Sequence, residues 1–449
     1  MWKKILLGVA ALGLIGGIVA YVVTRPEPPD TRFNGAYVLE DGTQVFVSPR
    51  EGKVLRYRLM NGESGALWPT GEGEYEGGPG WGEREPVVNR VKFARADGRS
   101  GFDWRRGDGD KVAHARWIDL PERVAKFPSG DLSLRGKLVL PEGAGPFPAV
   151  VIVHGSEDFS AVDYYYEPYM YAANGFAALA FDKRGTGESD GKYLQNFHVL
   201  SDDVVAAVRW LRSQPGIDGS RIHLAGFSQG GWIAPLAALK DGNIRSILVG
   251  YGVMVPVTGE DRWGYFYALQ QKGFGADAVD AADRVNAVIE DIVDRRQNRW
   301  SDLSSMLDAA RSQPWFDAVR GSDSILGQIS SSKMPMWGWR VFSWWRERSY
   351  GDTPYIDRLY DPVQTMQKLQ TPSLWILGGE DSSAPTPWTL RELEKLQSGG
   401  RPVQYHVFPG ADHGIMTFVK QENGERRYVG VEPDYYPMQI AWLREHNGS

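Results

Sequence analysis

With 449 residues, the chain is longer than one ordinary compact domain, and we expect two or three folded units. Hydrophobic residues make up 42% and charged residues 24%, a balance typical of a folded rather than a disordered protein. The net charge of -6, without a strongly basic stretch, argues against a nucleic-acid partner. The absence of cysteine excludes disulfides, thiolate metal sites and a cysteine nucleophile.

An uncharged apolar run at residues 5–23 follows Lys3 and Lys4 and has the length of a membrane-spanning helix. The positive charges before it predict that residues 1–25 are a single-pass anchor, with the remaining chain outside the cytoplasm on the periplasmic side. The alternative is a cleaved signal peptide and a secreted protein, although residues 18–20 match a cleavage site poorly.

Short alternating runs then predict an antiparallel β domain at residues 32–125, as a meander or a partial barrel. The pairs Asp41-Gly42 and Asn61-Gly62 lie between such runs and are typical of tight hairpin turns. This part of the sequence contains no cluster of residues suited to catalysis.

From residue 130 to residue 449 the pattern changes to apolar strands that alternate with helices. Buried strands are predicted at residues 149–154, 176–181, 222–227, 244–250, 373–377 and 403–408. This alternation predicts a mostly parallel sheet that helices cover on both faces. Residues 254–370 interrupt it with helical, tryptophan-rich sequence, which we interpret as a cap inserted over the active site, its tryptophans forming either a lid or the core of the insertion.

The sequence Gly226-Phe227-Ser228-Gln229-Gly230 lies between a predicted strand and a predicted helix. A tight turn at this position exposes the central side chain, and the following helix directs its free N–H groups at the same point. Glycines on both sides of the turn avoid steric clashes. We therefore predict that Ser228 is a nucleophile.

A serine nucleophile needs a base, and the base needs an acid that orients it. His413 follows the predicted strand 403–408, and Asp381 follows the predicted strand 373–377. Both would therefore lie at the same edge of the sheet as Ser228, which predicts a triad of Ser228, Asp381 and His413. Glu380 and Asp412 remain alternative acids.

An oxyanion hole needs two N–H donors near the nucleophile. We predict the backbone N–H groups of Gln229 and Ser156, with Gly155 as the alternative to Ser156. The glycine-containing loop 182–189 is interpreted as a structural turn, because it lacks the pattern of a phosphate-binding loop.

Five motifs together resemble the α/β-hydrolase superfamily, over about two thirds of the chain. They are HGS at 154–156, DKRGTGES at 182–189, GFSQG at 226–230, GGEDSSAP at 378–385 and GADHG at 410–414. Within the superfamily the sequence resembles bacterial esterases with an extra N-terminal domain and a helical insertion before the acid-bearing strand, and it is also similar to the serine aminopeptidase and prolyl-oligopeptidase-like groups. The resemblance implies a serine hydrolase that uses neither a metal nor an organic cofactor.

We therefore predict a serine hydrolase that cleaves a small-molecule carboxylic ester through an acyl-enzyme on Ser228, attached to the membrane by its N-terminal helix. One alternative is a serine peptidase, in which Glu157 and Asp158 would bind a substrate amine. A catalytically inactive binding protein is a further alternative, but all three triad residues are present.

Overall fold

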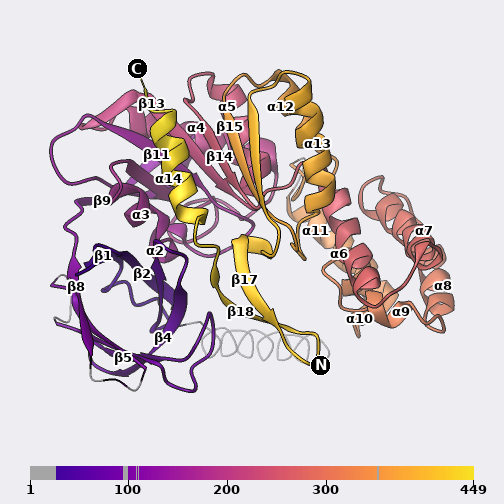
Figure 1. Ribbon diagram of the computed structural model, residues 1–449. Helices are drawn as coiled ribbons and strands as arrows, with labels where there is room; N and C mark the ends of the chain where they lie inside the picture. Colours follow the sequence, from indigo (N-terminus) through magenta and orange to yellow (C-terminus); the bar gives the residue numbers. More distant parts are fainter. Residues whose placement is uncertain (1–26, 95–99, 108, 110, 351–352, 449) are drawn as a thin grey trace, which may run out of the picture.

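The computed structural model describes residues 27–94, 100–107, 109, 111–350 and 353–448. Its chain forms a small β-barrel, a large mixed sheet between helices, and a helical insertion beside that sheet (Figure 1). The predicted α/β-hydrolase fold and N-terminal antiparallel β domain are thereby confirmed.

The N-terminal part is a closed antiparallel barrel, because the first strand pairs with both the second and the eighth. Its strands are β1 (Gly35–Leu39), β2 (Gln44–Glu51), β3 (Val54–Leu59), β4 (Ser64–Gly71), β5 (Glu74–Gly77), β6 (Asn89–Phe93), β7 (Phe102–Arg106) and β8 (Val112–Trp117). Alternate side chains point inward and form an aromatic core that includes Tyr37, Tyr57, Phe93 and Trp104. Edge-on ring contacts such as Tyr57–Trp104 fill this interior.

The central sheet has eight strands in the order β16-β15-β14-β13-β11-β12-β10-β9. They are β9 (Glu122–Ser129), β10 (Leu132–Val139), β11 (Phe147–Val153), β12 (Ala177–Phe181), β13 (Ile217–Phe227), β14 (Ile247–Gly250), β15 (Ser373–Gly378) and β16 (Val403–Phe408). The pairs from β16 to β12 are parallel, and the two pairs at one edge, β12 with β10 and β10 with β9, are antiparallel. The carboxyl ends of six neighbouring strands therefore meet along one rim.

Helices cover both faces of this sheet because the parallel strands are apolar on both sides. Val151 and Val153 face one core, and Val150 and Ile152 face the other. The helices that pack around the sheet are α2 (Ala161–Tyr164), α3 (Glu167–Ala172), α4 (Phe197–Arg212), α5 (Gly230–Asp241), α12 (Pro362–Lys368), α13 (Thr386–Ser398) and α14 (Tyr435–Glu445).

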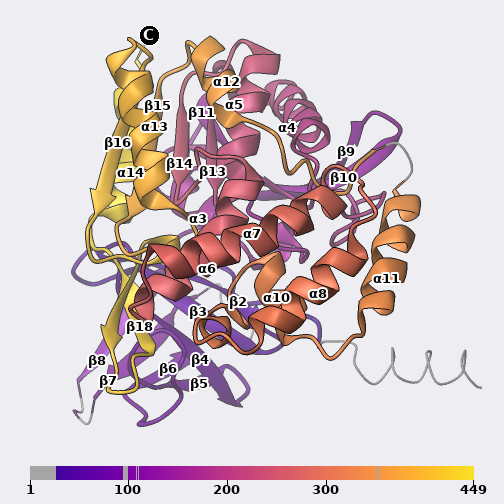
Figure 2. The same ribbon diagram turned by 90° about the vertical axis from the view of Figure 1, so that its right-hand side faces the viewer.

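Between β14 and β15 the chain forms a helical cap (Figure 2). Its helices are α6 (Val257–Gln271), α7 (Ala276–Val293), α8 (Trp300–Ala310), α9 (Phe316–Val319), α10 (Ile325–Ser331) and α11 (Met336–Ser349). The cap has its own apolar core, to which Trp315 contributes. The tryptophans of α11 do not form that core, because Trp337, Trp344 and Trp345 are all more than half exposed.

A hairpin of β17 (Met416–Lys420) and β18 (Arg426–Val431) follows the last strand of the large sheet. It lies against the barrel, where the Trp81 N–H donates to the Tyr428 carbonyl oxygen at 3.0 Å and the Val431 N–H donates to the Gly62 carbonyl oxygen at 2.9 Å. No pattern in the sequence predicted this hairpin. It connects the first part of the chain to the last (Figure 1).

The prediction of a membrane-spanning protein is corrected by the structure. In the described ranges, every helix is too short or too polar to span a bilayer. Residues 1–25, on which the prediction was based, lie outside those ranges.

Candidate active site

Ser228 occupies a strained turn between β13 and α5. Its φ angle is 52°, in the left-handed region that non-glycine residues seldom adopt. A Cβ atom on Gly226 would lie 2.5 Å from the Gly230 carbonyl oxygen, and one on Gly230 would lie 2.3 Å from the Val153 carbonyl oxygen. Only glycine fits at these two positions, so the sequence of the turn directly explains how Ser228 is presented at the rim.

The structure brings Ser228, His413 and Asp381 into one hydrogen-bonded series. The distance from His413 Nε2 to Ser228 Oγ is 3.1 Å, and that from His413 Nδ1 to Asp381 Oδ2 is 2.9 Å. The other oxygen of Asp381 accepts hydrogen bonds from the backbone N–H groups of Ser383 and Ala384. The loop therefore fixes the Asp381 carboxylate through Oδ1. This leaves Oδ2 to accept the hydrogen bond from His413 Nδ1.

The two alternative acids have other partners. The Glu380 carboxylate forms ion pairs with Lys420 and Arg426 rather than with the imidazole. The Asp412 carboxylate accepts hydrogen bonds from the backbone N–H groups of Ser382 and His413 and from the Tyr428 hydroxyl. Burial alone would raise the pKa of Asp412, but these hydrogen bonds and Arg426 lower it. Asp412 therefore holds together the loops that carry the acid and the base.

The imidazole of His413 is partly buried, and two opposing effects act on its pKa. Burial lowers the pKa, whereas the Asp381 carboxylate, its hydrogen bond and the nearby Glu260 carboxyl raise it; the net effect is a raised pKa. An imidazolium formed during a reaction would therefore be stabilised by the groups around it.

The two residues predicted to supply the oxyanion donors line the same cavity as Ser228. Gln229 directly follows it at the start of α5, and Ser156 follows β11, the strand next to β13 in the sheet. Among the residues for which the structure gives positions, neither backbone N–H donates to a protein acceptor. Gly155, the alternative donor, packs so closely that an added Cβ would lie 3.4 Å from the Cβ of Ser228.

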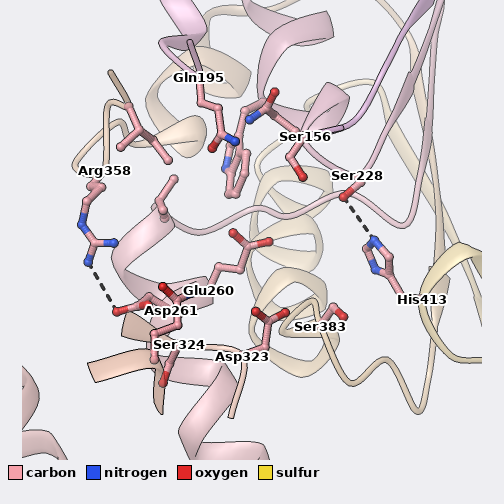
Figure 3. Close-up of a pocket in the computed structure, with 15 residues that line it drawn as sticks. Ser156, Gln195, Ser228, Glu260, Asp261, Asp323, Ser324, Arg358, Ser383 and His413 are labelled. Carbon is pink, nitrogen blue, oxygen red and sulfur yellow. Dashed lines mark hydrogen bonds and ion pairs between the residues drawn. The ribbon is translucent and has the colours of Figure 1, made fainter. Parts of the chain in front are cut away.

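A cavity of about 520 Å³ opens onto Ser228 and His413 (Figure 3). Ser156 and Gln229 line it on the sheet side, and the cap contributes three acids: Glu260, Asp261 and Asp323. Asp261 forms an ion pair with Arg358 at 3.4 Å. Within the described residues, Glu260 and Asp323 have no cationic partner at ion-pair distance, and both carboxyl groups face the cavity.

Burial raises the pKa of Glu260 to about 8; the neighbouring His413 opposes this shift, and Asp323 and Asp381 add to it. Sequence reasoning missed Glu260 and Asp323, because no motif surrounds either residue: Glu260 lies in the first turns of α6, and Asp323 lies in the loop before α10. Glu157 and Asp158, the pair that would bind a substrate amine under the alternative peptidase hypothesis, do not line this cavity. In the part of the chain that the structure covers, no cluster of three or more acidic or histidine side chains is arranged for a metal ion.

Residues 130–411 match the family model of X-Pro dipeptidyl-peptidase (S15 family). The chain belongs to the S15 family. This membership makes the protein a hydrolase of the α/β-hydrolase type, as the five motifs predicted.

Two curated relatives match shorter stretches of this S15 protein. The thiohydrolase aneE of Aspergillus aculeatus is 40% identical over 122 residues, which are 26% of this chain and 37% of the relative. The esterase EstD of Thermotoga maritima is 31% identical over 28% of this chain and 33% of its own length. The match thus spans only about a third of each of these two proteins. Among solved structures, the acylaminoacyl peptidase of Pyrococcus horikoshii aligns with a TM-score of 0.44 and 16% identity, covering 89% of this chain and 55% of that one.

Proposed function

We propose that the protein is a serine hydrolase that cleaves a carboxylic ester through an acyl-enzyme on Ser228. The observation that carries the proposal is the hydrogen-bonded series from the strained Ser228 through His413 to Asp381. A base within reach of a hydroxyl, itself held by a carboxylate, is the arrangement that activates a serine.

In the first half of the reaction, His413 Nε2 takes the proton of Ser228 Oγ as the oxygen attacks the substrate carbonyl carbon. The carbonyl π electrons move to the carbonyl oxygen, and the N–H groups of Gln229 and Ser156 stabilise the resulting oxyanion. When the oxyanion collapses, the bond to the leaving alkoxide breaks, and His413 gives that oxygen the proton. The acyl group stays on Ser228.

Water completes the cycle by the same steps. His413 removes a proton from the water, whose oxygen attacks the acyl carbon, and the proton returns to Ser228 Oγ as the ester bond to serine breaks. Asp381 accepts the Nδ1–H hydrogen bond throughout, which keeps Nε2 directed at Ser228. The preference for an ester over an amide is supported by the names of the relatives, a thiohydrolase and an esterase.

A fluorophosphonate probe tests the nucleophile, because it reacts covalently with an activated serine. We expect the wild type to be labelled and Ser228→Ala to remain unlabelled. The matched control is Ser305→Ala, which removes an exposed cap serine and should be labelled like the wild type. Labelling of Ser228→Ala would contradict the assignment, and an unlabelled wild type would favour the inactive binding protein.

A serine peptidase is the second candidate, and the two cap carboxyl groups favour it. Glu260 and Asp323 face the cavity without a cationic partner, so they suit a substrate that carries an ammonium group. The comparison of p-nitrophenyl butyrate with a Gly-Pro p-nitroanilide separates the two candidates. We expect a kcat/KM at least ~10²-fold higher for the ester; a preference for the anilide would replace the ester proposal by the peptidase.

A further inference from the structure

The loop that carries the predicted oxyanion donor Ser156 is held through two of its carbonyl groups. The Lys183 ammonium donates a hydrogen bond to the Gly155 carbonyl oxygen, with an Nζ–O distance of 2.6 Å. The Tyr193 hydroxyl donates to the Ser156 carbonyl oxygen. The Lys183 Nζ also lies 5.1 Å from the centre of the Tyr193 ring, so the two side chains form one contact group beside the loop.

Lys183 is an unusual lysine because it is almost completely buried, with 2% of its surface exposed. No carboxylate of the described residues lies within ion-pair distance of it. Burial without a paired acid is unfavourable for an ammonium group, and here it lowers the pKa of Lys183 to about 8. Within the described residues, the Gly155 carbonyl oxygen is the only hydrogen-bond acceptor of the Lys183 ammonium, so this contact alone satisfies the buried charge.

The geometry of a peptide group relates this contact to the oxyanion hole. In a trans peptide, the C=O of one residue and the N–H of the next point in opposite directions. The C=O of Gly155 points at Lys183, so the N–H of Ser156 points away from Lys183. Ser156 and Ser228 line the cavity whereas Lys183 does not, and Gly155 packs directly against Ser228.

We propose that Lys183, assisted by Tyr193, is a positioning residue that fixes the Gly155–Ser156 peptide so that the Ser156 N–H faces the developing oxyanion. This inference rests on the proposed serine hydrolase. If the peptide turned over, the Gly155 carbonyl oxygen would face the negative charge of the intermediate and oppose it. A buried cation is suited to prevent this, since hydrogen bonds from charged donors are about twice as strong as neutral ones.

The first test is Lys183→Met, which keeps the length and apolar stem of the side chain but removes the donor. We expect kcat to fall by about 10²-fold, as for the loss of one oxyanion donor, with KM changed less than about threefold. The matched control is Lys137→Met. Lys137 is also buried, and its ammonium contacts the Tyr169 hydroxyl away from the cavity, so its kcat should stay within about twofold of the wild type.

Inhibition by a trifluoromethyl ketone distinguishes loss of the oxyanion donor from a general destabilisation of the fold. Its adduct with Ser228 carries an oxyanion, so its Ki should rise in Lys183→Met by the same factor by which kcat/KM falls. Labelling of Ser228 by the fluorophosphonate probe should still go to completion. An unchanged Ki together with reduced kcat would overturn the inference, and so would an equal loss in Lys137→Met.

If Lys183→Met does not fold, Tyr193→Phe carries the test, because Tyr193 is only partly buried and its substitution removes the second carbonyl contact. We expect a fall in kcat of about 3- to 10-fold at constant KM, and an unchanged kcat would overturn the inference. If the wild type is active and both variants have its kcat and Ki, the role of Lys183 is refuted while the proposed function stands. A wild type without Ser228-dependent turnover would remove the proposed function as well.

Discussion

The barrel and the central sheet both have eight strands, but they differ in whether the buried polar groups described below have hydrogen-bond partners. Inside the barrel, the Asn89 side chain accepts from the Trp104 indole N–H at 3.0 Å and donates to the Tyr57 hydroxyl at 3.2 Å. At the rim of the sheet, both ring nitrogens of His154 and the Oε1 atom of Gln229 are buried without a hydrogen-bond partner, as judged over the described residues. Ser228 beside them has a strained backbone.

This difference follows from topology. A closed barrel returns each strand to its neighbour and leaves no free edge, whereas a parallel sheet collects the ends of its strands along one rim. Strained backbone is typical of sites where a protein acts on a substrate, and the surrounding structure compensates for its cost. Substitutions in the barrel should therefore change stability, and substitutions at the rim should change turnover.

The largest expected effect is that of Ser228→Ala on turnover. Loss of the nucleophile should lower kcat for p-nitrophenyl butyrate by about 10⁵- to 10⁶-fold. Ser228→Gly should be equally inactive and yet more stable by ~1 kcal/mol, because glycine adopts a φ of 52° without strain. Urea unfolding followed by circular dichroism measures the second effect, and a less stable glycine variant would contradict the view that the rim stores strain.

Asp381→Asn should lower kcat by about 10⁴-fold, because the amide no longer stabilises the imidazolium or selects the correct tautomer. The base must be neutral to act, so kcat/KM rises with pH as His413 loses its proton. The wild-type midpoint should lie above the usual histidine pKa, since Asp381 helps to raise the pKa of His413. In the variant the midpoint should move to lower pH, and a pH–rate profile that keeps its midpoint would argue against this coupling.

Trp104→Ala should have the opposite pattern. Removing this fully buried ring from the barrel leaves a cavity and takes away the donor to the Asn89 side-chain oxygen, and should lower the free energy of unfolding by about 3–5 kcal/mol. The folded variant should keep kcat/KM within about twofold of the wild type. Trp345→Ala is the control, because this tryptophan is exposed on α11 and its loss should cost less than about 0.5 kcal/mol.

The smallest effect is expected for Glu260→Gln, measured with a choline ester and its uncharged 3,3-dimethylbutyl isostere. The Glu260 carboxyl ionises as the pH rises through its pKa of about 8, so the wild-type preference for the cationic ester should increase over that range. The glutamine variant should lose about tenfold of this preference and its dependence on pH. If the glutamine variant keeps the wild-type preference for the cationic ester, Glu260 does not take part in substrate selection.

The residues at the rim of the sheet were the part of the molecule that the sequence predicted most fully. Runs of buried strand end directly before the loops of Ser228, Asp381 and His413, and this order places the three residues at one edge whatever the details of packing. The choice between Asp381 and Glu380 required coordinates, because neighbouring residues on a loop point in different directions. Only the structure shows that Lys420 and Arg426 hold Glu380 away from the imidazole.

Long-range features were not predictable. Closure of the barrel depends on the pairing of β1 with β8, and no local pattern signals contact between strands so far apart in sequence. The cap acids Glu260 and Asp323 approach the cavity only because the insertion folds back over the sheet. The exposed tryptophans of α11 show that aromatic content alone does not identify a core.

The hairpin of β17 and β18 has a consequence for how the chain can be divided. One side of it bonds to the barrel at Gly62 and Trp81, and the other presents Tyr428 and Arg426 to Asp412, the neighbour of His413. Through the hairpin and Asp412, the barrel thus helps to hold the general base His413 in position. A truncated chain that starts after β8 would keep every residue of the triad but lose this support. The barrel and the hydrolase domain therefore depend on each other and are unsuited to exchange as independent modules.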